Sequence, residues 1–84
     1  MAVVRIPPHD EEAEQAVLGA ILIDKDAIIA VSQLIIPENF YDDRHREIYQ
    51  GMLSLYEERK PIDLLTLTDT LKKKKTFDKV GGSS

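Results

Sequence analysis

The stretch from Asp42 to Tyr56, DDRHREIYQGMLSLY, decides the fold. Counted from His45, the large side chains recur at helical spacing, at Ile48, Tyr49, Met52, Leu55 and Tyr56. In a helix of about 3.6 residues per turn, this spacing places them all on one face. Asp42 offers a side-chain oxygen to the free amides of the first turn. The pattern therefore predicts a long helix that begins after Asp42 and buries one continuous face.

Two shorter helices are predicted on the N-terminal side of this stretch. Pro8 cannot continue a helix, so Asp10 is the expected cap of the first, which runs to about Leu22. Its inner face is expected to consist mostly of small residues, widened by Leu18 and Leu22. The expected inward positions are Ala13, Ala16, Val17, Ala20 and Ile21.

The second helix is expected to be capped by Asp24 and ended by Pro37. Its expected buried positions are Ile28, Val31 and either Leu34 or Ile35. Residues 37–41 then form a connector. Its Phe40 is predicted to fill the core, because a large ring supplies much of the apolar burial available to a small domain.

A fourth helix is predicted after Pro61, which interrupts the periodic pattern. The order Thr66-Leu67-Thr68-Asp69 fits a capping signature, so the helix is expected to start at Thr66, with Asp63 as the alternative cap. Leu67 and Leu71 are expected to point inward, and residues 72–75 finish the helix. Residues 77–80 are predicted to fold back as a short turn before Gly81 and Gly82.

The fold class is therefore all-α, a compact bundle of four to five short helices. A chain of 84 residues is one domain, residues 1–84, with residues 1–6 expected to be flexible. The sequence contains no cysteine, so disulfides and thiolate zinc sites are excluded and a cytosolic location is expected. Its start does not resemble a signal peptide, and no uncharged stretch is long enough to span a bilayer.

The motifs exclude several classes of chemistry. The four glycines do not build a phosphate-cradling loop or a dinucleotide-binding turn, so no catalytic, cofactor-binding or metal site is predicted. Only two histidines are present, too few for a zinc site made of imidazoles alone. His45 heads the apolar stripe of the long helix, where a half-buried, hydrogen-bonded histidine is expected; a pH-sensitive contact is the alternative.

Charge is divided unevenly along the chain. Residues 1–58 carry 12 acids and 4 bases, whereas residues 59–84 carry 3 acids and 7 bases. The acidic residues Glu11, Glu12 and Glu14 either match the dipole of the first helix or form a surface for docking a partner. The bases Lys72, Lys73, Lys74 and Lys75 either end a helix in solvent or contact phosphates. The latter reading, with Arg44 and Arg46, gives an alternative function as a small nucleic-acid-binding module.

Three stretches in register resemble the N-terminal domain of bacterial replicative DNA helicases of the DnaB family. The first is PPHDEEAEQAVLGA, residues 7–20. The second is PENFY, residues 37–41, followed by His45 and Ile48. The third is PIDLLTL, residues 61–67, followed by Val80, Gly81 and Gly82. Order and spacing agree from about residue 6 to residue 84.

The resemblance implies a non-catalytic assembly and docking domain in the collar of a hexameric helicase of the bacterial cytoplasm. The implied partners are other helicase subunits, primase and a helicase loader. In that family a separate motor domain uses ATP and magnesium and contacts DNA. The resemblance also implies that this chain stops before a further helix and a helical hairpin. One departure is the lysine run of residues 72–75, where the family usually mixes charges.

Overall fold

The computed structural model describes residues 10–73. Within this range the secondary structure is entirely helical, with no strand, so the predicted all-α class is confirmed. The elements are α1 (Glu11–Ile23), α2 (Ala27–Leu34), the 3-10 turn η1 (Pro37–Asn39), α3 (Asp43–Glu57) and α4 (Leu64–Lys73). The expectations for residues 1–6, for Lys74 and Lys75, and for the turn at 77–82 lie outside the described residues.

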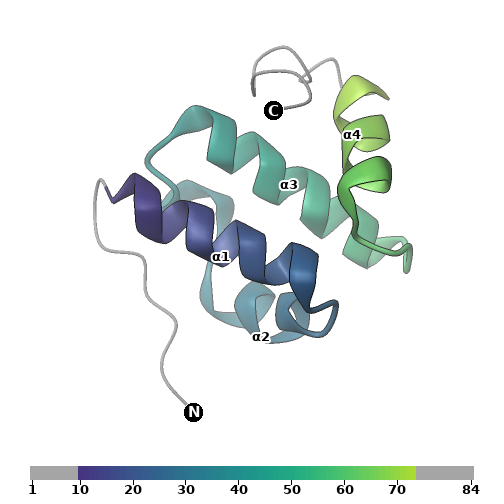
Figure 1. Ribbon diagram of the computed structural model, residues 1–84, viewed down its shortest axis with the longest axis horizontal. Helices are drawn as coiled ribbons and strands as arrows, with labels where there is room; N and C mark the ends of the chain where they lie inside the picture. Colours follow the sequence, from purple (N-terminus) through teal and green to yellow (C-terminus); the bar gives the residue numbers. More distant parts are fainter. Residues whose placement is uncertain (1–9, 74–84) are drawn as a thin grey trace.

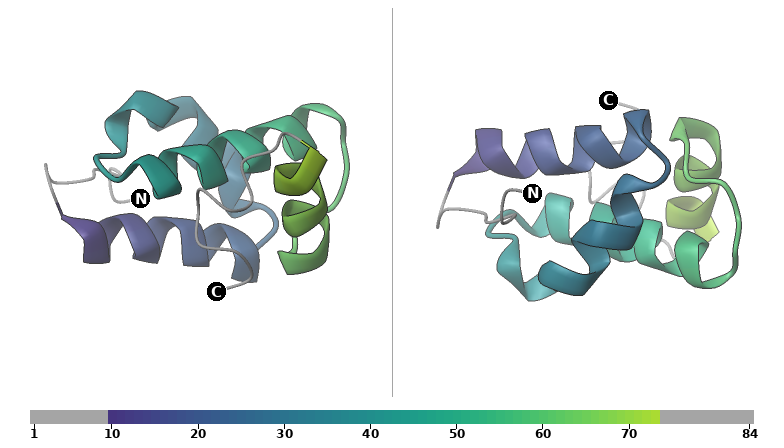
Figure 2. Two further views of the ribbon diagram at one scale, coloured as in Figure 1. Left: turned by 90° about the horizontal axis from the view of Figure 1, so that it is seen from above. Right: turned by 90° about the horizontal axis from the view of Figure 1, so that it is seen from below.

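Helix α3 lies at the centre of the bundle. Figure 1 shows α1 running alongside it, α2 packed against the pair, and α4 across the end of α3, and both views in Figure 2 keep this arrangement. Of the predicted face of α3, His45, Tyr49, Met52 and Leu55 are buried and Ile48 is partly buried. Gly51 is buried as well, although it is not among the predicted positions. Tyr56 departs from the predicted face, because its side chain is 39% exposed at the last turn.

The core is closed by two aromatic rings. Phe40 is fully buried, as predicted, and its ring centroid lies 5.0 Å from that of Tyr49. The Tyr49 hydroxyl donates a hydrogen bond of 2.7 Å to the carbonyl of Ile35 at the end of α2. Ile35 is buried and Leu34 is 48% exposed, which decides the open choice between them. The two rings of Phe40 and Tyr49 therefore join α3 to both the connector and α2.

Helix α1 differs from its predicted orientation. Its buried residues are Glu14, Leu18 and Ile21, whereas Ala16 and Ala20 are exposed. Leu22, expected to widen the apolar stripe, is 37% exposed. The buried face is rotated because Leu18 and Ile21 remove more apolar surface from water than the alanines do, and because the Glu14 carboxylate is hydrogen-bonded inside.

Two helix starts also differ from the prediction. Asp24 ends α1, and α2 begins at Ala27 after Asp26, with Asp24 accepting a hydrogen bond from the Asp26 amide. Helix α4 begins at Leu64, not Thr66, so the alternative cap Asp63 is the correct one. The Asp63 carboxylate accepts from the Thr66 amide at 2.9 Å, and the Thr66 hydroxyl accepts from the Asp63 amide at 3.0 Å. These reciprocal bonds satisfy two free amides of the first turn.

Helix α4 is held close to α3 by a glycine. A methyl group added at Gly51 would lie 3.1 Å from Cδ1 of Leu67 and 3.3 Å from Cδ2 of Leu71. These distances are tighter than ordinary van der Waals contact, so the absence of a side chain at Gly51 sets the spacing. Leu67 and Leu71 are buried there, as predicted.

Candidate protein-docking surface

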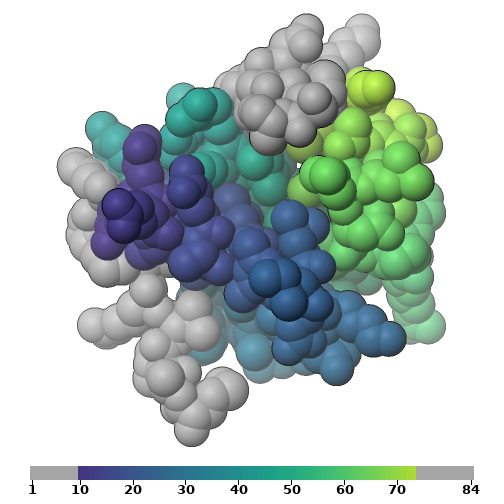
Figure 3. Space-filling view, in the orientation of Figure 1, coloured from purple at the N-terminus to yellow at the C-terminus, as the bar shows by residue number. Residues whose placement is uncertain are grey.

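Helices α1 and α3 both begin at the same end of the molecule, and both begin with acidic residues. Asp10 caps α1 by accepting a hydrogen bond of 3.0 Å from the Ala13 amide. Glu11 and Glu12 follow in the first turn and are exposed, as predicted. Figure 3 shows the start of α1, in purple, at the surface of this end. We call Glu11 and Glu12 the acidic patch.

Glu14 does not belong to this patch. Its side chain is 0% exposed, so the prediction that it lies on a docking surface is wrong. The carboxylate accepts hydrogen bonds from the Tyr41 amide at 2.6 Å, the Asp42 amide at 3.3 Å and Nδ1 of His45 at 2.7 Å. Glu14 therefore ties α1 to the connector and to the first turn of α3, and it has a structural role.

The environment of Glu14 keeps its carboxylate charged. Burial acts to raise its pKa, but hydrogen bonds from His45 and from the Tyr41 and Asp42 amides outweigh it, and the pKa falls below the ordinary 4.5. His45 is hydrogen-bonded to this carboxylate, as expected, but at 7% exposure it is buried and not half-buried. The helical spacing of residues 14, 18 and 21 was the sequence signal that could have revealed this buried face.

The arginines near the acidic patch form ion pairs with acids at the start of α3. Arg44 forms an ion pair of 2.9 Å with Asp42, and this contact holds the pKa of Asp42 well below its usual range. Arg46 pairs with Asp43 at 2.6 Å and donates to the carbonyl of Phe40 at 3.0 Å. Asp42 and Asp43 are neutralised in this way, whereas Glu11 and Glu12 form no ion pair within residues 10–73. The pKa of Arg44 is raised mainly by Asp42 and in smaller part by the charge of Glu11.

The basic residues proposed to contact phosphates are not gathered with these arginines. Lys72 and Lys73 are exposed in the last turn of α4, whereas Arg44 and Arg46 lie in the first turn of α3. Lys73 forms an ion pair of 3.2 Å with Asp69. Lys74 and Lys75 lie outside the described residues. Within residues 10–73 the candidate lysines and the two arginines thus belong to different helices, and the phosphate contact stays a prediction.

Residues 10–73 hold no cluster of histidine and carboxylate side chains suited to a metal ion. No helix in this range is long and apolar enough to cross a membrane. The acidic patch carries charge but no constellation of nucleophile, base and orienting group. Its chemistry suits the recognition of a basic protein surface.

Comparisons with known proteins show which family the chain belongs to. The replicative DNA helicase DnaB of Geobacillus stearothermophilus is 42% identical over 80 residues, which cover 95% of this chain and 18% of the relative. The replicative DNA helicase DnaB of Nostoc sp. is 46% identical over 78 residues, covering 93% of this chain and 9% of the relative. The chain thus spans less than a fifth of the length of these relatives.

A solved structure agrees with the sequence relatives. The crystal structure of the N-terminal domain of DnaB helicase from Mycobacterium tuberculosis superposes with a TM-score of 0.87 and 37% identity. The match covers 93% of this chain and 54% of that one. The family model for the DnaB-like helicase N-terminal domain matches residues 6–84. The chain is accordingly a member of the DnaB-like helicase N-terminal domain family.

Proposed function

We propose that this chain is the non-catalytic assembly and protein-docking domain of a hexameric replicative DNA helicase. The observation that carries the proposal is the match of residues 6–84 to the N-terminal domain, and not to a motor, in a family whose relatives are replicative helicases. ATP, magnesium and DNA belong to the motor domain of the whole helicase in this proposal. Its partners are the other helicase subunits, primase and a loader in the bacterial cytoplasm.

The acidic patch is the proposed contact for primase or loader. Glu11 and Glu12 are exposed in the first turn of α1, which the buried Glu14 hydrogen bonds tie to the connector and to α3, so the patch has a defined place on the folded domain. Charges on such a surface accelerate association with an oppositely charged partner and select against partners of like charge. A basic surface on the partner is therefore part of the proposal.

Reversing both charges of the patch, Glu11→Lys with Glu12→Lys, should weaken docking more than folding. Each reversal opposes the dipole of α1 and costs about 0.3–1 kcal/mol of stability. Docking should lose affinity by about tenfold or more, and the loss should shrink as salt rises. The measurement is a fluorescence titration of the full-length helicase with primase and with loader at two salt concentrations.

The matched control is Glu57→Lys with Asp69→Lys, the same change of net charge on exposed residues of α3 and α4 that belong neither to the patch nor to the pocket that Arg59 lines. The affinity of this control variant for the partner of the patch should stay within about twofold of the wild-type affinity. Exposed charges that lie beyond a Debye length of about 10 Å from a binding surface are largely screened. If the wild type and the Glu11, Glu12 variant bind both partners with equal affinity at both salt concentrations, the patch does not dock a partner. Its acids would then serve only the start of the helix.

The isolated 84-residue chain should neither bind nor hydrolyse ATP. Its sequence contains no glycine-rich loop followed by lysine and Ser/Thr, and such a loop supplies the amides and the cation that hold phosphates. Isothermal calorimetry with Mg-ATP should show no saturable heat, while the full-length helicase provides the positive control. Saturable micromolar binding by the isolated chain would contradict its non-catalytic role.

A further inference from the structure

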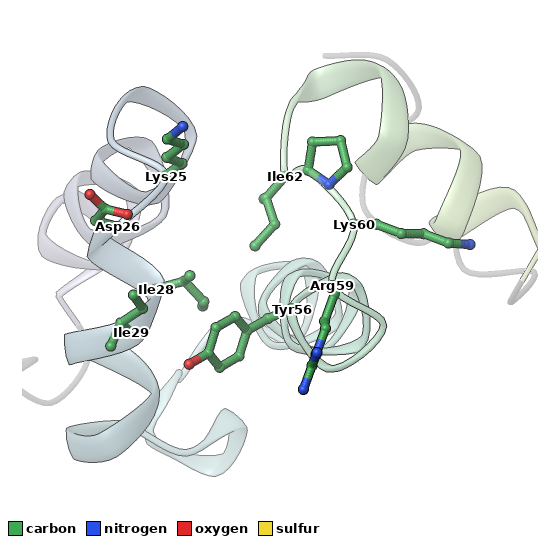
Figure 4. A pocket seen from close by; sticks show the side chains of 9 residues that line it. Lys25, Asp26, Ile28, Ile29, Tyr56, Arg59, Lys60 and Ile62 are labelled. Carbon is green, nitrogen blue, oxygen red and sulfur yellow. The ribbon is translucent and has the colours of Figure 1, made fainter.

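A groove of about 300 Å³ lies at the opposite end of α3 from the acidic patch, between α2 and the segment before α4. The side chains of Ile28, Ile62 and Tyr56 converge on it from three elements, as Figure 4 shows. Ile28 and Ile62 are buried and form the floor, whereas Ile29 and Tyr56 are 46% and 39% exposed. This volume is at the lower limit of small-molecule sites, roughly 300–1,000 Å³, and suits one or two apolar side chains.

The edge of the groove carries more positive than negative charge. Lys25, Arg59 and Lys60 line it together with one acid, Asp26. Lys60 is paired with Glu58 at 3.0 Å, but no ion pair is recorded for Lys25 or Arg59 among residues 10–73. Figure 4 places Lys25 and Arg59 on opposite sides of the apolar floor. An occupant with apolar anchors flanked by carboxylates would match both walls.

Arg59 occupies a position where helices ordinarily have glycine. Its φ is 59°, the single positive value for a residue other than glycine in the described range. The Lys60 amide donates to the Leu55 carbonyl at 2.9 Å, and the Arg59 amide to the Tyr56 carbonyl at 3.1 Å. These two bonds define a Schellman motif, in which Arg59 stands at the position that glycine fills without steric cost. A strained backbone that keeps an arginine side chain at the edge of a groove points to a use for that side chain.

We propose that this groove docks an amphipathic helix of a partner protein, with apolar side chains on Ile28, Ile29, Tyr56 and Ile62 and carboxylates facing Lys25 and Arg59. The inference rests on the proposed docking function of the domain and adds a second surface of opposite charge to the acidic patch. Helices that bind in this way place anchors three and four residues apart into an apolar groove. The charge of the edge selects an acidic helix over a basic one.

The test uses the 84-residue chain and two labelled helical peptides of about 16 residues, roughly four turns. Both carry leucines three and four residues apart; one has glutamate at the flanking positions and the other lysine. Fluorescence anisotropy should show about tenfold tighter binding of the glutamate peptide, because like charges across an interface are unfavourable. In NMR spectra of the chain, the backbone amide signals that move when the peptide binds should be those of residues 25–29 and 56–62.

The decisive variant is Arg59→Gly, because glycine favours the left-handed conformation and should keep or raise the melting temperature. It should weaken the glutamate peptide about fivefold or more, whereas Arg59→Lys should restore most of the affinity. Ile29→Ser should weaken both peptides by shortening the apolar wall. Lys73→Gln is the matched control, since it removes a cation from α4 outside the groove and should change little.

Three outcomes would overturn the inference. They are equal binding of the two peptides, an Arg59→Gly variant that binds like the wild type, and self-association of the chain that Arg59→Gly abolishes, which would make the groove an interface between copies. The proposed docking function is tested separately by primase and loader titrations of the helicase. The docking function holds if those titrations succeed, even when the groove binds no peptide. A failure of the groove is therefore distinguishable from a failure of the docking function.

Discussion

Replacing Glu14 by glutamine is expected to destabilise the domain by about 1–3 kcal/mol, the usual cost of leaving a buried hydrogen-bond donor without its acceptor. Glutamine has nearly the same shape but a single acceptor oxygen. Its NH₂ group would face one of the three donors that the carboxylate satisfies, the Tyr41 amide, the Asp42 amide or Nδ1 of His45. A small domain has about 0.05–0.15 kcal/mol of stability per residue, so this loss is a large part of the total.

Urea unfolding at pH 7 measures this effect, with Glu12→Gln as the matched control. Glu12 lies on the same helix turn and is exposed, so its substitution should cost at most about 0.3–1 kcal/mol from the helix dipole. Similar midpoints for Glu14→Gln and Glu12→Gln would show that the buried hydrogen bonds do not hold α1 to α3. The slope of the transition should stay unchanged if both variants fold to the same native state.

The same substitution should remove part of the acid sensitivity of the wild type. The folded pKa of Glu14 lies below its ordinary value of 4.5, so the unfolded chain takes up the proton first as the pH falls. Its contribution is thus fully present above about pH 4.5 and is lost as the pH falls through the folded pKa. Unfolding series between pH 7 and pH 3 should show a smaller fall in stability for Glu14→Gln than for the wild type.

The sequence was most informative where one periodicity covered several turns. The face of α3 has large side chains at consecutive helical positions, so its start and most of its buried residues could be predicted. Phe40 could be placed in the core because few side chains in so short a chain are large enough to bury as much apolar surface as its ring does. The prediction was wrong at Tyr56, whose ring lines the open groove between α2 and the segment before α4 and is 39% exposed.

The burial of Glu14 could not be predicted from charge. An acid in the first turn of a helix is favourable at the surface, where it complements the dipole, and this reason applies equally to Glu11, Glu12 and Glu14. What separates Glu14 is a set of donors 27 to 31 residues away along the chain. Such donors become visible only when the connector and α3 are folded against α1.

The starts of α2 and α4 illustrate a second limit of local patterns. Asp24 and Asp26 are both competent caps, and Thr66 and Asp63 both belong to plausible capping signatures. The choice between them depends on which neighbouring amides are free, and this is settled by the path of the chain. The groove at Arg59 was also beyond prediction, because a positive φ at arginine has no sequence signature.

Phe40→Ala is expected to cost about 3–5 kcal/mol, which is the usual range for removing a fully buried ring. The ring is 0% exposed and packs at 5.0 Å against Tyr49, whose hydroxyl is bonded to the end of α2. Its loss should open a cavity where the connector, α2 and α3 meet. Because such a cost approaches the whole stability of a small domain, largely unfolded protein is expected near 37 °C.

Two further variants separate this cavity from a local change in the connector. Phe40→Leu keeps part of the apolar volume and should cost less than alanine, whereas Tyr41→Ala alters a side chain that is 58% exposed and should cost less than about 1 kcal/mol. The backbone bonds of both residues, to Arg46 and to Glu14, are retained in every variant. Thermal and urea unfolding should therefore rank the variants as Tyr41→Ala, Phe40→Leu and Phe40→Ala in order of increasing loss. A melting temperature of Phe40→Ala within a degree or two of the wild type would mean that the ring does not hold the three elements together.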